Sequence, residues 1–429
     1  MLEPEICVVG AGAAGLWAAA RVARLAGDRP ERRGVLLLEK TPRTGTKVLA
    51  SGGTRCNLTT TLDADRAARL FGPRGARFLR AAFRALPPEA VRGRFAEWGV
   101  ETVEEPLEKV FPRSGSAREV RDALEREARA AGAAIRCGAG VAELAREEPR
   151  WRLRLADGET VRCRSLLLCP GGRSYPRTGT TGDGYAWLAD LGLPLVEPVP
   201  ALVPLTSPAP WVHALTGIAL QEVEARLVDP DGRVLGRRRR PVLFTHRGLS
   251  GPGAMDLSEP VAREEAAARS GGREPREHAL LLDLAPERGW EDLRAELVAA
   301  AGRPGRPGLA RALPIELPRR VLQRVAAQAG LEETGAAADL SKAARHRLIE
   351  ALKGLAVPVG GTLGFDQAEV TAGGLALSSL DPRTLRVNGW PGLYAFGEVL
   401  DLAGPIGGLN FQSAFATAEL AAAHAAGSG

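Results

Sequence analysis

The stretch from residue 6 to residue 39 constrains the fold more than any other part of the chain. An apolar run at 6–9 passes directly into the glycine-rich segment GAGAAG at 10–15, and the alanine-rich residues 16–26 have helical composition. A second apolar run at 35–38 ends in Glu39. This order of strand, glycine turn, helix, strand and acid predicts the βαβ unit of a dinucleotide-binding fold. The alternative is a βαβ unit that tolerates glycine and binds nothing.

The glycines have separate tasks in such a unit. Gly10 permits the tight turn, Gly12 lets the backbone approach a pyrophosphate, and Gly15 lets the helix pack closely on the strand. The N-terminus of the helix offers free N–H groups to the phosphates. We expect Glu39 to accept hydrogen bonds from the ribose hydroxyls.

Composition indicates an ordinary globular protein. The 429 residues are 45% hydrophobic and 25% charged, and this length predicts two or three domains. The first strand begins almost at the first residue and no apolar run is long enough to span a bilayer, so we predict a cytoplasmic protein without a membrane partner.

Five cysteines without a C-x-x-C pair predict neither a disulfide framework nor a zinc site, and we expect no metal. We interpret Cys56 as a structural thiol, since no resolving cysteine is near it in the sequence.

The formal net charge of +6 reflects an arginine-rich composition and is weak evidence for a partner. The one long basic run, Arg237 to Arg240, has no aromatic residues interleaved with it. We interpret it as a solvated strand edge and do not predict a nucleic-acid partner. The sequence does not predict an oligomeric state.

Residues 51–57 follow the ribose-binding strand and are predicted to be a loop that lies along an extended cofactor. The Gly52–Gly53 pair allows close backbone approach, while Ser51, Arg55 and Asn57 could satisfy polar edges. The alternative is an ordinary surface loop.

Two further segments are predicted at the same crevice, because the carboxyl ends of parallel strands share one edge. A strand at 165–169 ends at Gly171 and Gly172, and its loop continues through Thr178 and Gly182. Val141, after a glycine, is a candidate for backbone contact with an adenine ring.

Near the C-terminus, a strand at 392–396 runs into an acidic and glycine-rich turn before the alanine-rich helix 411–425. The turn contains Gly397, Glu398, Asp401, Gly407, Gly408 and Asn410. We predict a second anion-attracting helix N-terminus here, and the alternative is a plain turn before a C-terminal helix.

Prolines crowd residues 194–210 and mark a domain boundary near residue 195, because proline excludes central strands and helices. Short strands at 221–228, 236–244 and 278–284 then indicate a small β-barrel or antiparallel sheet. Residues 287–352 have a helical pattern.

His246 lies where a predicted strand breaks into a polar glycine loop, and histidine is the natural proton carrier near neutral pH. We name His246 and Tyr175 as candidate proton donors. A structural role is the alternative for His246.

A series of sequence blocks resembles the BaiN/YhiN-type NAD(P)/FAD-dependent oxidoreductases. The blocks are GAGAAG at 10–15, LLLEK at 36–40, SGGTRCNLT at 51–59, SYPRTGTTGDGY at 174–185, PALVPL at 200–205, LFTHRGLSGP at 243–252, VTAGGL at 370–375 and LYAFGEVLDLAGPIGGLNFQSA at 393–414. They stand in the family's order and span nearly the whole chain.

The resemblance implies an α/β fold with a Rossmann-like FAD-binding domain made of residues 1–195 and 376–429. A β-barrel-like domain, residues 196–286 and 353–375, is inserted into it. A helical subdomain, residues 287–352, interrupts that insertion.

The resemblance also implies FAD on the segments singled out above. The expected cofactor-binding residues are Gly10, Gly12, Ala13, Ala14, Gly15, Glu39, Lys40, Ser51, Gly52, Gly53, Arg55, Asn57, Val141, Gly171, Gly172, Thr178, Gly182, Gly397, Glu398, Asp401, Gly407, Gly408 and Asn410. The chain departs from the family at Thr54, where a glycine is usual, at Thr60, where asparagine is usual, and at Leu409, where a tyrosine is usual. Substrate specificity therefore transfers less readily than FAD binding.

The implied function is reduction of an activated C=C bond, or a similar electron-poor small molecule, by hydride transfer from N5 of FAD. NAD(P)H is the expected electron donor and would visit the same flavin face, since only one dinucleotide fingerprint is present. Two alternatives stay open: a non-catalytic or sensing FAD protein, and a flavin-dependent enzyme that modifies RNA.

Overall fold

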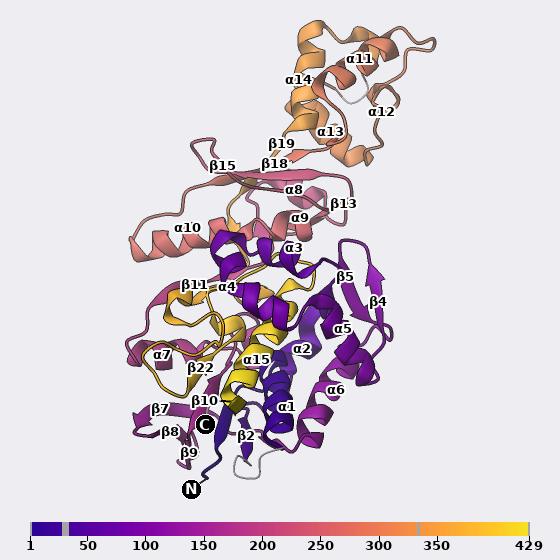
Figure 1. Cartoon of the computed structure of the whole chain (residues 1–429). Coiled ribbons are helices and arrows are strands. Elements are labelled where there is room, and N and C mark those ends of the chain that lie inside the picture. The colour runs from indigo at the N-terminus through magenta and orange to yellow at the C-terminus, as the bar shows by residue number, and fades with distance from the viewer. Residues whose placement is uncertain (1, 28–33, 333–334, 428–429) are drawn as a thin grey trace. The chain divides into compact units, whose positions relative to one another are not determined.

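The structure is a computed structural model that describes residues 2–27, 34–332 and 335–427. The chain divides into two compact units, one made of Met1–Val199 and Ala368–Gly429 and the other of Pro200–Gln367 (Figure 1). The second unit is therefore an insertion in the sequence of the first.

A five-stranded parallel sheet forms the centre of the first unit, in the order β22-β10-β1-β2-β6. The strands are β1 (Ile6–Val9), β2 (Val35–Leu38), β6 (Ala134–Arg136), β10 (Ser165–Leu168) and β22 (Leu393–Ala395). Every residue of β1, β2 and β10 is buried. Burial on both faces explains why these strands are continuous apolar runs instead of alternating patterns.

Two helices from opposite ends of the sequence pack together beside this sheet. Helix α1 (Ala13–Gly27) contacts α15 (Leu409–Gly427), and α6 (Ala117–Ala130) also packs on α1 (Figure 1). Trp17 of α1 contacts Phe415 of α15 with ring centroids 5.0 Å apart. The N-terminal and C-terminal parts of the chain thus share one hydrophobic core.

The remaining elements of the first unit cover the sheet and extend its loops. The helices are α2 (Thr46–Ala50), α3 (Ala64–Arg69), α4 (Gly72–Ala85), α5 (Pro88–Glu97) and α7 (Asp183–Asp190). The small sheets are β3-β5-β4 (Thr59–Thr60, Lys109–Pro112, Thr102–Glu105) and β7-β8-β9 (Val141–Glu147, Arg150–Leu155, Thr160–Cys163). Three separate helices, α3, α4 and α5, follow one another along the chain, and Pro88 begins α5 at a position where its missing N–H costs nothing.

The second unit contains two antiparallel sheets and a helical segment. One sheet has the order β13-β16-β17-β12-β20 (Ala219–Leu220, Val242–Thr245, Gly248–Ser250, Leu205–Thr206, Gly361–Thr362). The other has the order β15-β14-β18-β19 (Val234–Arg239, Glu224–Val228, His278–Asp283, Leu355–Val359). Helices α8 (Pro210–Ala214), α9 (Pro252–Met255) and α10 (Ser258–Ser270) accompany the sheets. Helices α11 (Trp290–Ala301), α12 (Leu309–Ala312), α13 (Arg319–Gln328) and α14 (Lys342–Lys353) occupy the segment with the helical pattern.

The units meet in sequence at 199/200 and 367/368, whereas we expected boundaries after residues 195 and 375. The second difference arises because β21 (Val370–Leu375) pairs with β11 (Leu195–Ala201). Strand β21 is buried along its whole length and includes residues 371–374. Its pairing keeps this segment with the first unit.

Candidate functional site

In the glycine turn between β1 and α1, packing requires glycine at positions 10 and 15 but not at position 12. Gly10 has φ +103°, and a Cβ there would lie 2.5 Å from the carbonyl oxygen of Cys169. A Cβ at Gly15 would lie 1.8 Å from the carbonyl oxygen of Gly10. A Cβ at Gly12 would meet nothing within 4 Å. Packing against the protein therefore does not require glycine at position 12, and the open side of Gly12 is the space that a pyrophosphate would use. The turn fits FAD.

Glu39 is held against this turn at the end of β2. Its Oε2 accepts the N–H of Ala11 at 2.8 Å, and its Oε1 accepts the N–H and the hydroxyl of Thr41, each at 2.8 Å. The carbonyl oxygen of Glu39 accepts the N–H of Ala139 at 2.8 Å, so the segment leading to Val141 runs beside the acid. The turn, the acid and the candidate adenine segment therefore lie together, as the AMP half of a dinucleotide requires.

Lys40, the residue after Glu39, bonds to the loop that follows β10. The Nζ of Lys40 lies 2.6 Å from Oδ2 of Asp183 and also donates to Thr181. Although burial acts to raise the pKa of Asp183, hydrogen bonds from Lys40 and Thr181 lower it below its ordinary value. Gly171 and Gly182 both have left-handed backbone angles in this loop. Thr178 lies between them and donates its hydroxyl to the carbonyl oxygen of Tyr175 at 2.7 Å.

Glu398 is the centre of a hydrogen-bonded network. Its carboxylate accepts Lys47 Nζ at 2.6 and 2.8 Å, the hydroxyl of Ser174 at 2.8 Å and the N–H of Thr371 at 3.0 Å. A Cβ at Gly172 would lie 3.0 Å from this carboxylate. The network joins the segments after β2, β10 and β22 at the carboxyl edge of the sheet.

The 51–57 segment is an irregular turn and not a regular helix, because Gly52 and Gly53 within Ser51–Thr54 have non-helical backbone angles. Gly52, Gly53, Thr54 and Cys56 all have positive φ angles between 54° and 72°. Ser51 donates its hydroxyl to the carbonyl oxygen of Val48 at 2.6 Å.

The two large polar side chains of the 51–57 segment, Arg55 and Asn57, interact with other residues of the protein. Arg55 forms an ion pair with Glu105 and stacks on the ring of Phe111, with 4.1 Å to the ring centroid. Asn57 Oδ1 accepts the N–H of Val110 at 3.0 Å. Contact of this segment with FAD therefore stays a prediction, and the backbone at Gly52 and Gly53 is its best-suited part.

The C-terminal segment meets the first helix. A Cβ at Gly397 would lie 3.1 Å from the Cβ of Ala14, and its N–H donates to Thr417 at 3.2 Å. Asn410 closes the turn before α15 by exchanging two hydrogen bonds with Gly404, at 2.8 and 2.9 Å.

Gly407, Gly408 and Asp401, which belong to the same turn, have different environments. A Cβ at Gly408 would lie 1.9 Å from the carbonyl oxygen of Thr59, so packing demands this glycine. Gly407 has φ +144°. Asp401 donates its N–H to the carbonyl oxygen of Leu375 at 3.0 Å.

The two candidate proton donors belong to different units. Tyr175 is half-buried in the first unit, and burial, together with the charge of Glu369, raises the pKa of its hydroxyl above the ordinary value. His246 is exposed on the turn between β16 and β17 in the second unit. The role of each stays a prediction.

Sequence reasoning missed the roles of three residues of this region. Lys47 and Thr371 bond to Glu398; Lys47 lies in none of the family blocks, and Thr371 lies in the VTAGGL block without having been singled out. The hydroxyl of Tyr185 is buried without a hydrogen-bond partner within the described residues, and burial raises its pKa. The TGDGY block was the one signal that pointed to Tyr185.

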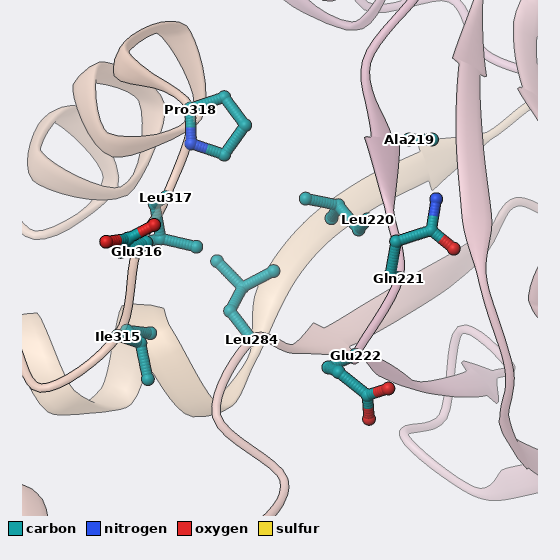
Figure 2. A pocket seen from close by; sticks show the side chains of 9 residues that line it. All are labelled: Ala219, Leu220, Gln221, Glu222, Leu284, Ile315, Glu316, Leu317 and Pro318. Carbon is teal, nitrogen blue, oxygen red and sulfur yellow. The ribbon is translucent and has the colours of Figure 1, made fainter.

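The second unit contains a separate cavity of about 390 Å³ (Figure 2). Leu220, Leu284 and Leu317 point toward one another across it, and Glu222 and Glu316 are its charged residues. Two carboxylates without a cation or a glycine turn are unsuited to phosphate groups, so we do not assign FAD to this cavity.

Within residues 2–27, 34–332 and 335–427, no helix is long and apolar enough to cross a membrane. The same residues contain no group of three or more His, Cys, Asp or Glu that could hold a metal ion.

The family model of the HI0933-like protein Rossmann domain matches residues 4–424. The chain belongs to the HI0933-like family. This finding confirms the resemblance to BaiN/YhiN-type proteins, and the chain is an FAD-dependent oxidoreductase with a Rossmann-like fold.

Two curated relatives of the chain have different names. A "Ribosomal RNA dihydrouridine synthase" of Escherichia coli (strain K12) is 31% identical over 423 residues, which are 96% of each chain. A "3-dehydro-bile acid delta(4,6)-reductase" of Clostridium scindens is 30% identical over 424 residues, covering 98% of this chain and 99% of the relative. The first name gives an RNA substrate for that relative, and the second gives a bile acid for the other.

Solved structures agree on the fold. The 3-ketosteroid-delta4-(5alpha)-dehydrogenase from Rhodococcus jostii RHA1 superposes with a TM-score of 0.52 at 15% identity, covering 99% of this chain and 97% of that chain. At this identity the likeness concerns the fold alone.

Proposed function

We propose that this protein reduces a C=C bond conjugated to a carbonyl group, with NAD(P)H as the electron donor. The observation that carries the proposal is the arrangement around residues 10–15. The open side of Gly12 and the carboxylate of Glu39 share the carboxyl edge of the sheet with the Glu398 network. FAD-dependent hydride chemistry is the reaction type that such a site supports.

The names of the two relatives share one chemical theme. Dihydrouridine is uridine with two hydrogens added across a ring C=C bond that is conjugated to a carbonyl. A delta(4,6)-reductase acting on a 3-dehydro (3-oxo) compound likewise removes C=C bonds conjugated to a carbonyl. Each reaction adds a hydride to an electron-poor carbon and a proton to its neighbour, and we propose this addition for the present chain.

The chain's own residues would bind the cofactor and supply the proton. The turn at 10–15, Glu39 and the segment 139–141 would hold the AMP half of FAD, and Glu398 would orient the segments around the other half. Bound FAD supplies two-electron hydride transfer. Tyr175 would keep its proton at neutral pH, because a tyrosine ordinarily titrates at about pH 10 and burial raises this pKa further, and it could give that proton to the substrate carbon next to the carbonyl.

Anaerobic stopped-flow absorbance tests the donor half of the proposal. The flavin band at about 450 nm should bleach rapidly after addition of NADPH or NADH, as expected of a reducible flavin. A 4-ene-3-one steroid or a uridine-containing RNA should then restore the band, and mass spectrometry should show a product heavier by two hydrogens. Flavin that stays oxidised with both nucleotides would refute NAD(P)H as the donor and favour a sensing role.

A further inference from the structure

Helix α4 has a row of arginines on one face. Arg74, Arg77, Arg80 and Arg84 are spaced by three or four residues, so they share a face of a helix with 3.6 residues per turn. Arg69, the last residue of α3, precedes them, and all five side chains are exposed. We call these five residues the α4 arginine face.

Within residues 2–27, 34–332 and 335–427, no carboxylate neutralises the charge of this face. No ion pair or hydrogen bond joins any of its five side chains to another described residue. The basic run of β15 behaves differently. Arg237 lies 3.4 Å from Glu224, Arg238 lies 3.5 Å from Asp256, and Arg239 pairs with glutamates as well. The run that stands out in the sequence is therefore paired, whereas the α4 arginine face is available to an anion.

The opposite side of α4 fixes the helix in the first unit. Phe78, Leu79 and Phe83 are buried, and α4 packs against α15. A Cβ at Gly75 would lie 3.3 Å from Leu402, and a Cβ at Gly404 would lie 2.7 Å from the ring of Phe71. The first turn of α4 thus contacts the 402–404 segment, which lies between Asp401 and Gly407 of the predicted cofactor site.

We infer that the α4 arginine face binds the phosphate backbone of an RNA whose base is presented to the flavin site. Guanidinium groups bind phosphate oxygens through paired hydrogen bonds, and exposed arginines without carboxylate partners keep those donors available. Arg74 and Arg84 are separated by roughly 15 Å at a rise of 1.5 Å per residue, which is long enough to follow several phosphates of one strand.

This inference deepens the proposed function by naming the substrate class, and it rests on that proposal. The name of the Escherichia coli relative supports RNA as the partner over an acidic protein. A small neutral enone would need no such face.

The test compares two triple variants with the same loss of charge. Arg77→Gln, Arg80→Gln and Arg84→Gln remove the centre of the face, and glutamine preserves helix propensity. Arg152→Gln, Arg154→Gln and Arg162→Gln are the matched control, because these arginines already pair with Glu147 and Glu143. Circular dichroism and FAD content establish that both variants are folded.

Fluorescence anisotropy measures binding to a fluorescein-labelled RNA stem-loop across a range of salt concentrations. The face variant should lose about tenfold or more in affinity, and the slope of log K against log salt should become shallower by about 2 to 3, because three phosphate contacts disappear. The control variant should bind like the original protein.

Three outcomes would overturn the inference: no binding of the stem-loop by the original protein, equal losses in the two variants, or equally effective competition by polyglutamate. Reduction of a 4-ene-3-one steroid by the original protein reports on the proposed function separately. Steroid reduction without RNA binding would refute the RNA surface and leave the proposed chemistry in place.

Discussion

Lys47 and Glu398 are 351 residues apart in the sequence, yet the Nζ of Lys47 lies 2.6 Å from Oε2 and 2.8 Å from Oε1 of Glu398. About a fifth of each side chain is exposed, 23% for Lys47 and 22% for Glu398. Ser174 donates to the same carboxylate at 2.8 Å. This ion pair and the Ser174 hydrogen bond thus join the segments that follow three strands of the parallel sheet.

Removing either partner of this pair should destabilise the protein. Lys47→Gln and Glu398→Gln should each lower the free energy of unfolding by about 1 to 3 kcal/mol, because each leaves a largely buried charge without its partner. The double variant should lose less than the sum of the two. Urea unfolding measures these effects, and Arg113→Gln is the control, since its exposed pair with Glu101 should contribute less than about 1 kcal/mol. Additive losses would show that the pair is not coupled.

Gly12→Ala and Gly15→Ala should separate cofactor binding from folding. A Cβ at position 12 meets no protein atom, so Gly12→Ala should change the melting temperature of the apoprotein little while weakening FAD binding about tenfold or more. A Cβ at position 15 would clash with the carbonyl oxygen of Gly10, so Gly15→Ala should impair folding itself. Fluorescence titration of apoprotein with FAD is the measurement. Normal FAD affinity in Gly12→Ala would place the pyrophosphate elsewhere.

Thr54→Gly should stabilise the protein, although it removes a side chain. Thr54 has φ +72°, a left-handed conformation that is strained for a β-branched residue. Relief of this strain should raise the free energy of unfolding by about 0.5 to 1 kcal/mol, after the entropic cost of glycine. Thr160→Gly, in strand β9, is the control and should destabilise instead. Equal destabilisation by both changes would argue against strain at position 54.

The thiol of Cys56 should be unreactive in the folded protein. It is fully buried, and burial raises the pKa of its thiol to about 12, so almost no thiolate exists at pH 8. A disulfide reagent should therefore titrate Cys56 only after unfolding, when all five cysteines become accessible. Cys56→Ala should leave the rate of flavin reduction by NAD(P)H within about twofold. A large drop in that rate, with normal FAD content, would point to a redox role.

The pH profile should distinguish the proton donors. A tyrosine acts as an acid below its pKa and loses this ability as the pH rises through that value. Since burial and Glu369 raise the pKa of Tyr175, a mechanism that uses Tyr175 should show a flat kcat up to about pH 9. Tyr175→Phe should then lower kcat by about 10²-fold or more. Full activity of Tyr175→Phe would exclude Tyr175 as the proton donor and favour His246.

Local patterns made much of the fold predictable. The run from β1 through α1 to β2 is contiguous and has its own glycine and acid signals, and the helical pattern at 117–130 is strongly amphipathic. The partners of Lys47 and Thr371 were not predictable, because they depend on residues far away in the sequence. The pairing of β21 with β11 shifted a boundary for the same reason. The spacing of the α4 arginines is visible in the sequence, but only the structure shows that Arg237 to Arg239 are paired and these are not.

The split of the first unit into Met1–Val199 and Ala368–Gly429 governs the order of events on the ribosome. Trp17 of α1 donates to Glu419 of α15, 402 residues later, at 2.9 Å. At a synthesis rate of about 5 to 20 residues per second, roughly 20 to 80 seconds pass between the synthesis of α1 and that of α15, which covers it. During this time the inserted unit is synthesised and can begin to fold. During that interval the apolar side of α1 is exposed, so we expect the nascent chain to require protection by chaperones until α15 emerges.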